Sequence, residues 1–218
     1  MYFNVDDNYS TERTNMVNEQ IKARGISNNK LISALLKIPR HEFVPKEYRR
    51  YSYYDGPLPI GEDQTISQPY IVVLMTELLD LKRGEKVLEI GTGCGYQTAI
   101  LCELGCEVYT IEIIERLGIT AKKLLDKLGC KNICFKIGDG YKGWEEKSPF
   151  DAIIVTASPH VLPKPLVNQL KTGGRMVIPI KEEYQELKLI IKKETGLITK
   201  RITPVRFVPM TGEAEKAV

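Results

Sequence analysis

The stretch DQTISQPY, residues 63–70, carries hydroxyl and amide side chains but no histidine or cysteine that could serve as a base or nucleophile. Pro69 favours the first position of a helix, which leaves free backbone N–H groups close to the hydroxyls of Thr65 and Ser67. Such donors can hold a carboxylate, which needs no general base because its ordinary pKa is about 4. The stretch is therefore a candidate site for orienting a carboxylate, although Ser67 could instead simply cap the helix.

A second set of residues with chemical potential lies where three predicted strands end. The run LEIGTGCGY places Gly91, Gly93 and Gly95 between a strand and a helix, where glycine allows a sharp turn and close approach to a ligand. Glu112 ends the next strand, where a carboxylate can bind both hydroxyls of a ribose. Asp139 follows the third strand and could accept a hydrogen bond from an adenine amino group.

Each of these features also has a simpler explanation when it is taken alone. The glycine run could be a tight turn without a ligand, Glu112 a solvated strand end and Asp139 a turn former. Parallel strands, however, bring their carboxyl ends to one edge of a sheet, where such folds bind ligands. The three strand ends together therefore indicate a nucleoside site.

The ligand is expected to be S-adenosylmethionine rather than a dinucleotide. A pyrophosphate favours the full GxGxxG pattern and a free helix N-terminus, whereas this loop has GxGxG. Glu89 precedes the loop, and an acidic residue repels phosphate but suits a cation. S-adenosylmethionine has an ammonium group, a sulfonium group and no phosphate, so the sequence favours a methyltransferase over a dehydrogenase.

The elements that must position these residues alternate between strands and helices from Lys86 onward. Apolar runs predict parallel strands at 86–90, 107–112, 131–138, 150–157 and 175–180. Helical patterns predict helices at 96–105, 115–129 and 163–174. Two further strand patterns within 186–210 surround KETG with no room for a helix, which predicts an antiparallel hairpin.

The first 80 residues are predicted to form an N-terminal helical cap. Helical periodicity covers 10–24 and 27–37, with Ser10 and Ser27 as candidate N-caps. Turn formers predict a loop at 53–64, and 69–81 is apolar enough to pack on the sheet. We therefore expect an α/β, Rossmann-like class I methyltransferase with a mostly parallel seven-stranded sheet. It forms a single domain, 1–218, with the cap and substrate loop in 1–80 and the cofactor-binding core in 81–218.

Composition and charge exclude several functional classes. Hydrophobic residues make up 43% and charged residues 27% of the chain, as in ordinary globular proteins. A net charge of +3 is too small to indicate nucleic acid binding by itself. The start has no apolar signal-peptide core, and no apolar run reaches the roughly 18 residues of a membrane span, so we expect a cytoplasmic protein. The five cysteines match no zinc pattern, so we expect reduced thiols and no metal, an intracellular disulfide being the alternative.

The methyl acceptor is expected to be a carboxylate. Enzymes that methylate amino groups of bases often carry Asn/Asp-Pro-Pro-aromatic after the fourth strand, whereas this strand ends VTASPH at 155–160. A carboxylate needs only to lose its water and to be aimed in line at the sulfonium methyl group. The hydroxyls of Thr65 and Ser67 meet that demand.

Several stretches, taken together, resemble the protein-L-isoaspartate O-methyltransferases along nearly the whole chain. QTIS followed by Pro two residues later, together with RFVP, is far more specific to that family than the glycine loop. The matching stretches are IPRHEFVP (38–45), PIGEDQTISQPYIVVLMTELL (59–79), VLEIGTGCGYQTAIL (87–101), GDG (138–140), FDAIIVTA (150–157), LKTGGRMVIPI (170–180) and VRFVPMTG (205–212).

The resemblance implies a repair reaction (EC 2.1.1.77 class). Such an enzyme methylates the free α-carboxyl of an isoaspartyl residue in a damaged protein and releases S-adenosylhomocysteine. The ester then closes to a succinimide, whose hydrolysis returns some normal aspartate. Damaged proteins and peptides are thus the expected partners.

The resemblance also implies which residues act. It designates Ser67 as the catalytic residue, with no metal. Substrate contacts are expected at Thr65, Ser67, Gln68, Tyr70 and Val208. With the strand-end residues, cofactor contacts are expected at Gln64, Thr65, Ile66, Ser67, Glu89, Gly91, Gly93, Cys94, Gly95, Glu112, Asp139, Gly140 and Thr211. Many family members have Ala-Pro-His after the serine, so a role for that histidine does not carry over to Tyr70, which remains a candidate hydrogen-bonding group.

Two alternative functions remain open at this point. Another S-adenosylmethionine enzyme, such as an RNA base methyltransferase, should show a basic stripe, and KEYRRYSYY (46–54) is the one basic–aromatic candidate. That stretch reads more simply as a solvated helix end. A catalytically dead methyltransferase fold acting as a binding subunit would have no need of Glu112, Asp139 or the glycine loop.

Overall fold

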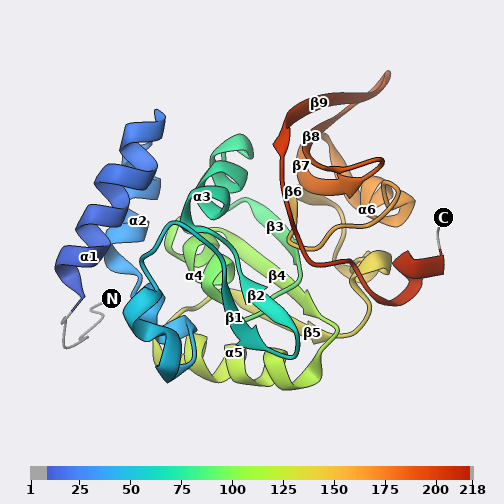
Figure 1. Cartoon of the computed structure of the whole chain (residues 1–218). Helices are drawn as coiled ribbons and strands as arrows, with labels where there is room; N and C mark the ends of the chain where they lie inside the picture. The colour runs from blue at the N-terminus through green and yellow to red at the C-terminus, as the bar shows by residue number, and fades with distance from the viewer. Residues whose placement is uncertain (1–8, 217–218) are drawn as a thin grey trace.

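The structure is a computed structural model that describes residues 9–216. Its centre is a seven-stranded sheet in the order β5-β4-β3-β6-β7-β8-β9 (Figure 1). The first five strands in chain order run parallel, and β8 and β9 close the sheet antiparallel. The predicted fold class is confirmed. The strands are β3 (Lys86–Ile90), β4 (Glu107–Glu112), β5 (Ile133–Ile137), β6 (Phe150–Val155), β7 (Leu170–Lys181), β8 (Gln185–Lys193) and β9 (Gly196–Pro204).

Alternating side chains of the central strands enter two different hydrophobic clusters. Val87 of β3 packs in a cluster with Met75 and Leu101, whereas its neighbour Leu88 packs with Phe150 and Leu166 on the other face. Both faces of β3 and β6 are therefore buried, which explains their continuous apolar runs. The covering helices are α3 (Pro69–Leu78), α4 (Tyr96–Glu103), α5 (Glu115–Lys127) and α6 (Lys164–Gln169).

The N-terminal cap joins the core through one shared hydrophobic cluster. Ile21, Leu35 and Phe43 of the cap pack there with Tyr96 and Ile100 of α4. The predicted helix at 10–24 is continuous but changes pitch, from α-helix to a π-helical turn to a 3-10 turn. The cap consists of α1 (Ser10–Asn15), the π-helical turn Met16–Ile21, the 3-10 turn Lys22–Arg24, α2 (Asn29–Lys37) and the 3-10 turns Arg40–Phe43 and Lys46–Tyr51.

Two predicted N-caps are corrected by the structure. α2 is capped by Asn28, whose Oδ1 accepts hydrogen bonds from the backbone N–H groups of Lys30 and Leu31 at 3.1 and 3.4 Å. Asn and Ser both serve as N-caps, and the first helical residue here is one position later than Ser27 allows. Ser10 is the first residue of α1 itself, and the preceding Tyr9 makes no side-chain cap.

The predicted loop at 53–64 contains a short hairpin. β1 (Leu58–Gly61) pairs antiparallel with β2 (Gln64–Ile66). Glu62 and Asp63 make the turn with φ of 52° and 55°, as two-residue hairpin turns require. The tip reaches α5, where Glu62 accepts a hydrogen bond from Arg116 at 3.0 Å (Figure 1). Turn formers in the sequence therefore marked the hairpin turn rather than an open loop.

The helix predicted at 163–174 ends five residues early. α6 stops at Gln169, and Leu170 begins β7 opposite Phe150 of β6. Both side chains are at most 1% exposed, so burying Leu170 within the sheet outweighs its preference for helix.

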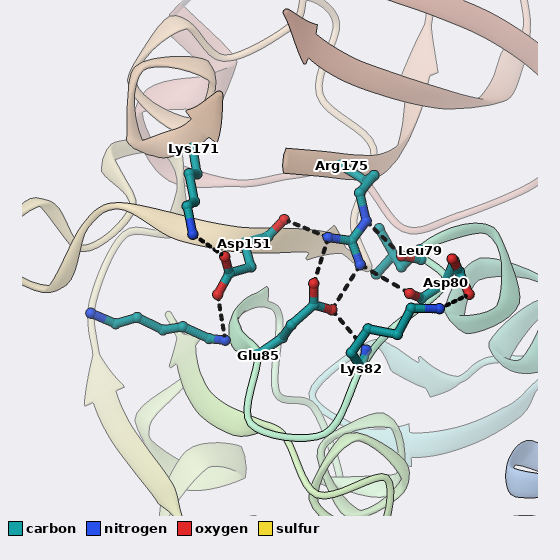
Figure 2. A network of polar contacts seen from close by, with 8 residues as sticks. Leu79, Asp80, Lys82, Glu85, Asp151, Lys171 and Arg175 are labelled. Carbon is teal, nitrogen blue, oxygen red and sulfur yellow. Dashed lines mark hydrogen bonds and ion pairs between the residues drawn. The ribbon is translucent and has the colours of Figure 1, made fainter. Parts of the chain in front are cut away.

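A polar network at the amino edge of the sheet ties β3, β6 and β7 to the end of α3 (Figure 2). Arg175 is its centre and makes a two-pronged bond to Glu85, with its Nη1 and Nη2 at 2.9 and 2.8 Å from the carboxylate oxygens. Its Nε donates to the carbonyl of Leu79 at 2.7 Å. Asp151 accepts from the backbone of Lys86 and from Lys171. The network lies at the opposite edge from the carboxyl ends of the strands.

Replacing Arg175 with methionine should lower the free energy of unfolding by about 2–3 kcal/mol, because charged hydrogen bonds are lost from a half-buried site. Burial raises the pKa of Glu85, but the hydrogen bonds from Arg175 and Lys82 hold it below its ordinary value. A depressed carboxyl pKa stabilises the fold above about pH 4 and loses its effect as the pH falls through the folded pKa.

R175M should therefore show a smaller fall in Tm than wild type between about pH 6 and pH 3. Thermal unfolding followed by circular dichroism measures both effects. The control is Lys171→Met, which removes only an exposed partner of Asp151 and should cost less than about 1 kcal/mol. Parallel pH curves for R175M and wild type would contradict the assignment.

Candidate active site

A cavity opens at the carboxyl edge of the sheet, between the cofactor loop and the segment that leads into α3. The ends of β3, β4 and β6 form its floor, and β2 and the C-terminal segment 208–211 form its walls. Most of the predicted site residues gather there. Those lining the cavity are Gln64, Thr65, Ile66, Ser67, Gly91, Gly93, Cys94, Glu112, Gly140, Val208 and Thr211.

Two glycines in this cavity leave no space for a side chain. Gly91 has φ of 91°, and a Cβ there would lie 2.3 Å from Oγ1 of Thr156. That hydroxyl donates to the carbonyls of Ile90 and Gly91, at 3.0 and 2.8 Å. A Cβ on Gly140 would lie 2.3 Å from Cγ2 of Ile90. The cavity therefore has the bare backbone cradle that a nucleoside requires.

Glu112 is fixed at the end of β4 by two backbone donors. Its Oε2 accepts from the N–H of Gly93 at 2.7 Å, and its Oε1 accepts from the N–H of Ile114 at 2.9 Å. The side chain is only 6% exposed and lines the cavity. A carboxylate has about four acceptor positions, so both oxygens can still accept ribose hydroxyls.

Glu89 lies beneath the cavity and not on its wall. It is fully buried, and its Oε2 accepts from the hydroxyls of Thr98 and Thr110 at 2.6 and 2.7 Å. Its Oε1 has no hydrogen-bond partner. Burial raises the pKa of Glu89 to about 8 despite these two bonds. The acidic group expected to face a cation is thus neutral near pH 7 and buried behind the loop.

Two other predicted cofactor residues also lie outside the cavity wall. Asp139 accepts from the N–H of Tyr141 at 2.9 Å and from the N–H of Glu213 at 2.8 Å, so it caps a 3-10 turn and holds the C-terminal segment. Gly95 is the N-cap of α4 with φ of 90°, and a Cβ there would lie 2.9 Å from Cδ1 of Leu125. Gly95 therefore serves helix packing in this structure.

Ser67 stands where the cofactor cavity meets a second one. The second cavity shares Thr65, Ser67, Thr156 and Val208 with the first and continues along Pro57, Gln68, Ile71 and 204–207. Pro69 is the first residue of α3, as predicted, and its N-cap is Gln68 without a side-chain cap. The Ser67 hydroxyl therefore does not cap the helix.

Tyr70 lies outside both cavities. It belongs to a cluster of side chains that holds residues 64–68, which we call the active segment. The guanidinium of Arg24 lies 4.8 Å from the centre of the Tyr70 ring and pairs with Asp55. Gln68 also donates to Asp55, at 2.7 Å. The hydrogen bond from Arg24 holds the pKa of Asp55 below its usual value. This cluster ties the segment to the cap and to the loop before β1.

Sequence reasoning missed several residues that line the cofactor cavity. Thr156 and Ala157 follow β6. The sequence of this strand end was used only to show that the Asn/Asp-Pro-Pro-aromatic pattern is absent. Ile113 and Ile114 directly follow Glu112, so their position after a strand end could have indicated them. The missed lining residues are Val72, Met75, Ile90, Thr92, Tyr96, Gln97, Ile111, Ile113, Ile114, Thr156, Ala157, Pro209 and Met210.

Within residues 9–216, no group of three or more His, Cys, Asp or Glu side chains is arranged to hold a metal ion. No helix in the same range is long and apolar enough to cross a membrane.

The parallel sheet, the glycine cradle and the fixed acid at the end of β4 define a class I S-adenosylmethionine-dependent methyltransferase. The family model "Protein-L-isoaspartate(D-aspartate) O-methyltransferase (PCMT)" matches residues 11–215. The chain belongs to this family and is a protein-L-isoaspartate O-methyltransferase, so the predicted repair activity and cofactor are confirmed.

Curated relatives and solved structures agree with the family match. Protein-L-isoaspartate O-methyltransferases of Dictyoglomus turgidum and Geobacter metallireducens are 56% and 52% identical to this chain, over 94% of it and 93% and 96% of their own lengths. A solved protein-L-isoaspartate O-methyltransferase superposes with a TM-score of 0.86 at 34% identity, over 93% of this chain and 67% of that one. A Plasmodium falciparum structure, described as a beta-aspartate methyltransferase in complex with S-adenosyl-L-homocysteine, gives 0.79 at 27% identity over 93% and 97%.

Replacing Glu89 with glutamine should change how stability depends on pH in the ligand-free protein. The folded pKa of about 8 lies above the ordinary value of about 4, so the folded state holds a proton that the unfolded state has lost. Stability should therefore fall as the pH rises between these values. Glutamine cannot lose this proton, so the fall in Tm between about pH 6 and pH 9 should be smaller in E89Q.

Differential scanning calorimetry measures this slope, which is independent of any overall loss of stability from the new amide. The control is Glu107→Gln, at the opposite end of β4. An E89Q curve parallel to that of wild type would show that Glu89 is already ionised in the folded protein.

Proposed function

We propose that residues 64–68 orient the α-carboxyl of an isoaspartyl residue, with Ser67 as the positioning donor. The observation that carries this proposal is the position of Ser67 on the wall shared by two cavities. The first has the glycine cradle and Glu112, and the second is lined by Gln68, Phe207 and their neighbours. A peptide in the second cavity would thus present its carboxyl group to the cofactor cavity at Ser67.

The groups that line the two cavities favour an acceptor that arrives already ionised. Burial raises the pKa of Cys94 to about 11 and that of Tyr96 to about 12, so neither is a base near pH 7. Both oxygens of Glu112 accept backbone hydrogen bonds, and their remaining acceptor positions are the ones assigned to the ribose hydroxyls. Arg206 is a cation. Neither histidine is among the residues that line the two cavities. An alcohol or ammonium acceptor would need a base that these cavities lack, whereas a carboxylate does not.

The cofactor residues divide into contacts and supports. When bound, S-adenosylmethionine supplies the electrophilic methyl group on its sulfonium. Glu112 would accept the ribose hydroxyls, and the backbone at Gly91, Gly93 and Gly140 would approach the nucleoside closely. Asp139 supports this arrangement by fixing the segment that carries Thr211. Loss of water from around Ser67 when both ligands bind would favour a reaction in which a negative and a positive charge are neutralised.

The proposed partners are damaged proteins and peptides that contain isoaspartate, acted on in the cytoplasm by a single-domain enzyme. A nucleic acid partner gains little support from the basic stretch at 46–54. Within it, Arg49 pairs with Glu42 at 3.2 Å, and the Arg50 guanidinium lies 4.5 Å from the centre of the Tyr51 ring. Arg49, Arg50 and Tyr51 belong to a 3-10 turn of the cap, and none of them is among the residues that line either cavity.

The substrate assignment is tested with matched peptides that differ only in Asp or isoAsp. Incubated with S-adenosylmethionine labelled in its methyl group, the enzyme should label the isoAsp peptide alone. The label should be released as methanol in mild base, because it is held as a carboxyl ester. RNA serves as the competing acceptor. Equal labelling of both peptides, or base-stable labelling of RNA, would reject the proposal.

Replacing Ser67 with alanine should lower kcat roughly 10- to 150-fold. This range corresponds to the loss of one hydrogen bond to a charged group, which contributes about 1.5–3 kcal/mol. Affinity for S-adenosylhomocysteine, measured by isothermal titration calorimetry, should stay within a few-fold. Ser52→Ala is the matched control, since its hydroxyl donates to Arg49 in the cap. Wild-type turnover in S67A would remove Ser67 from the mechanism.

A further inference from the structure

Arg40 is a buried cation in the cap, directly behind the active segment. It begins the 3-10 turn after α2 and is 0% exposed. Its Nη2 donates to the carbonyl of Ser67 at 2.7 Å, and its Nε donates to the carbonyl of Ser52 at 2.7 Å. Among the described residues, no carboxylate forms an ion pair with it. The positive charge is therefore balanced only by carbonyl dipoles and an aromatic face.

That aromatic face belongs to the cofactor cavity. The guanidinium carbon of Arg40 lies 4.9 Å from the centre of the Tyr96 ring, and Tyr96 lines the cavity. Nη1 of Arg40 and the hydroxyl of Tyr96 are both buried, and the two side chains interact with each other rather than with a carboxylate. Arg40 thus contacts two walls of the site without being exposed to either cavity.

Such an arrangement does not favour the stability of the fold. A buried charge without an opposite partner costs free energy, which carbonyl acceptors and a ring face offset only in part. Burial lowers the pKa of Arg40, yet a guanidinium stays protonated in proteins. Replacing buried ionic groups with apolar ones is often neutral or stabilising. The geometry instead suits a residue that orients the Ser67 peptide and places a positive charge behind it.

We propose that Arg40 is a positioning residue for methyl transfer, acting through Ser67 on the acceptor carboxylate. By holding the Ser67 carbonyl, it fixes the peptide that carries the Ser67 hydroxyl and leads into the N-terminus of α3. Its unpaired charge also makes this corner favourable for an anion. The inference rests on the proposed role of Ser67 in binding the carboxylate.

The two contributions of Arg40 can be separated by substitution. Lysine keeps the charge but cannot bond both carbonyls with a rigid fork, so R40K should lower kcat roughly tenfold while leaving KM for the isoAsp peptide within about threefold. Methionine has similar length and no charge, so R40M should show the same loss in kcat and a KM raised roughly tenfold. Neither variant should change the affinity for S-adenosylhomocysteine, which lacks the sulfonium charge, more than a few-fold.

The control variant is Arg13→Lys, in the other buried arginine of the cap. Arg13 is 5% exposed, and its Nη1 donates to the carbonyl of Leu36 at 3.0 Å, away from residues 64–68. R13K should lower Tm without changing kcat or KM. If R40M does not fold, the split between kcat and KM in R40K still tests the positioning role.

The outcomes separate this inference from the proposed function. If the wild-type enzyme fails to distinguish isoAsp from Asp peptides, the proposed substrate is wrong. If it does distinguish them but R40K keeps wild-type kcat, or R13K loses as much kcat as R40K, Arg40 is only a structural residue. A selective loss of kcat in R40K, with recovery of KM relative to R40M, supports the proposal.

Discussion

The contact between Gly91 and Thr156 controls the shape of the site. The Thr156 hydroxyl occupies the position that a Cβ of residue 91 would need, and it bonds the two carbonyls at the end of β3. The loop after β3 must therefore run close against the end of β6. Glu112 then holds the next part of that loop through the N–H of Gly93. The backbone at Gly91 and Gly93 thus follows a fixed path along one side of the cavity.

The kind of reaction follows from the absence of a base or nucleophile among the groups described at this site. Its acids and thiols are either buried and neutral, as Glu89 is, or engaged with backbone groups, as Glu112 is. A methyl transfer to a carboxylate needs neither a base nor a nucleophile from the protein, since both reactants arrive with the charges that the reaction neutralises. The protein must therefore remove water from the acceptor carboxylate and orient it in line with the methyl group. The cap contributes to this orientation, because Arg40 donates to the Ser67 carbonyl and Arg24 pairs with Asp55, which in turn accepts from Gln68.

The strands that carry the cofactor residues could be predicted well because their signals are local. β3 and β4 have the predicted ends, since short apolar runs next to glycine or Glu112 mark them clearly. Features that depend on distant partners were harder to predict. Leu170 became strand because it meets Phe150, and Asp139 turned away from the cavity because Glu213 offers a backbone donor. Thr156 was missed because its role requires a contact with Gly91, 65 positions earlier in the chain.

The β1–β2 hairpin is held to the rest of the protein in two different ways. Gln64–Ile66 of β2 line the cofactor cavity, and the buried Ile66 packs in the hydrophobic cluster shared by the cap and α4. The tip is held to α5 by the pair between Glu62 and Arg116. Arg116 is 84% exposed, and ion pairs of this kind contribute only about 0–1 kcal/mol. The tip is therefore the weakly held part of the hairpin, whereas the end that lines the cofactor cavity is fixed by the hydrophobic core.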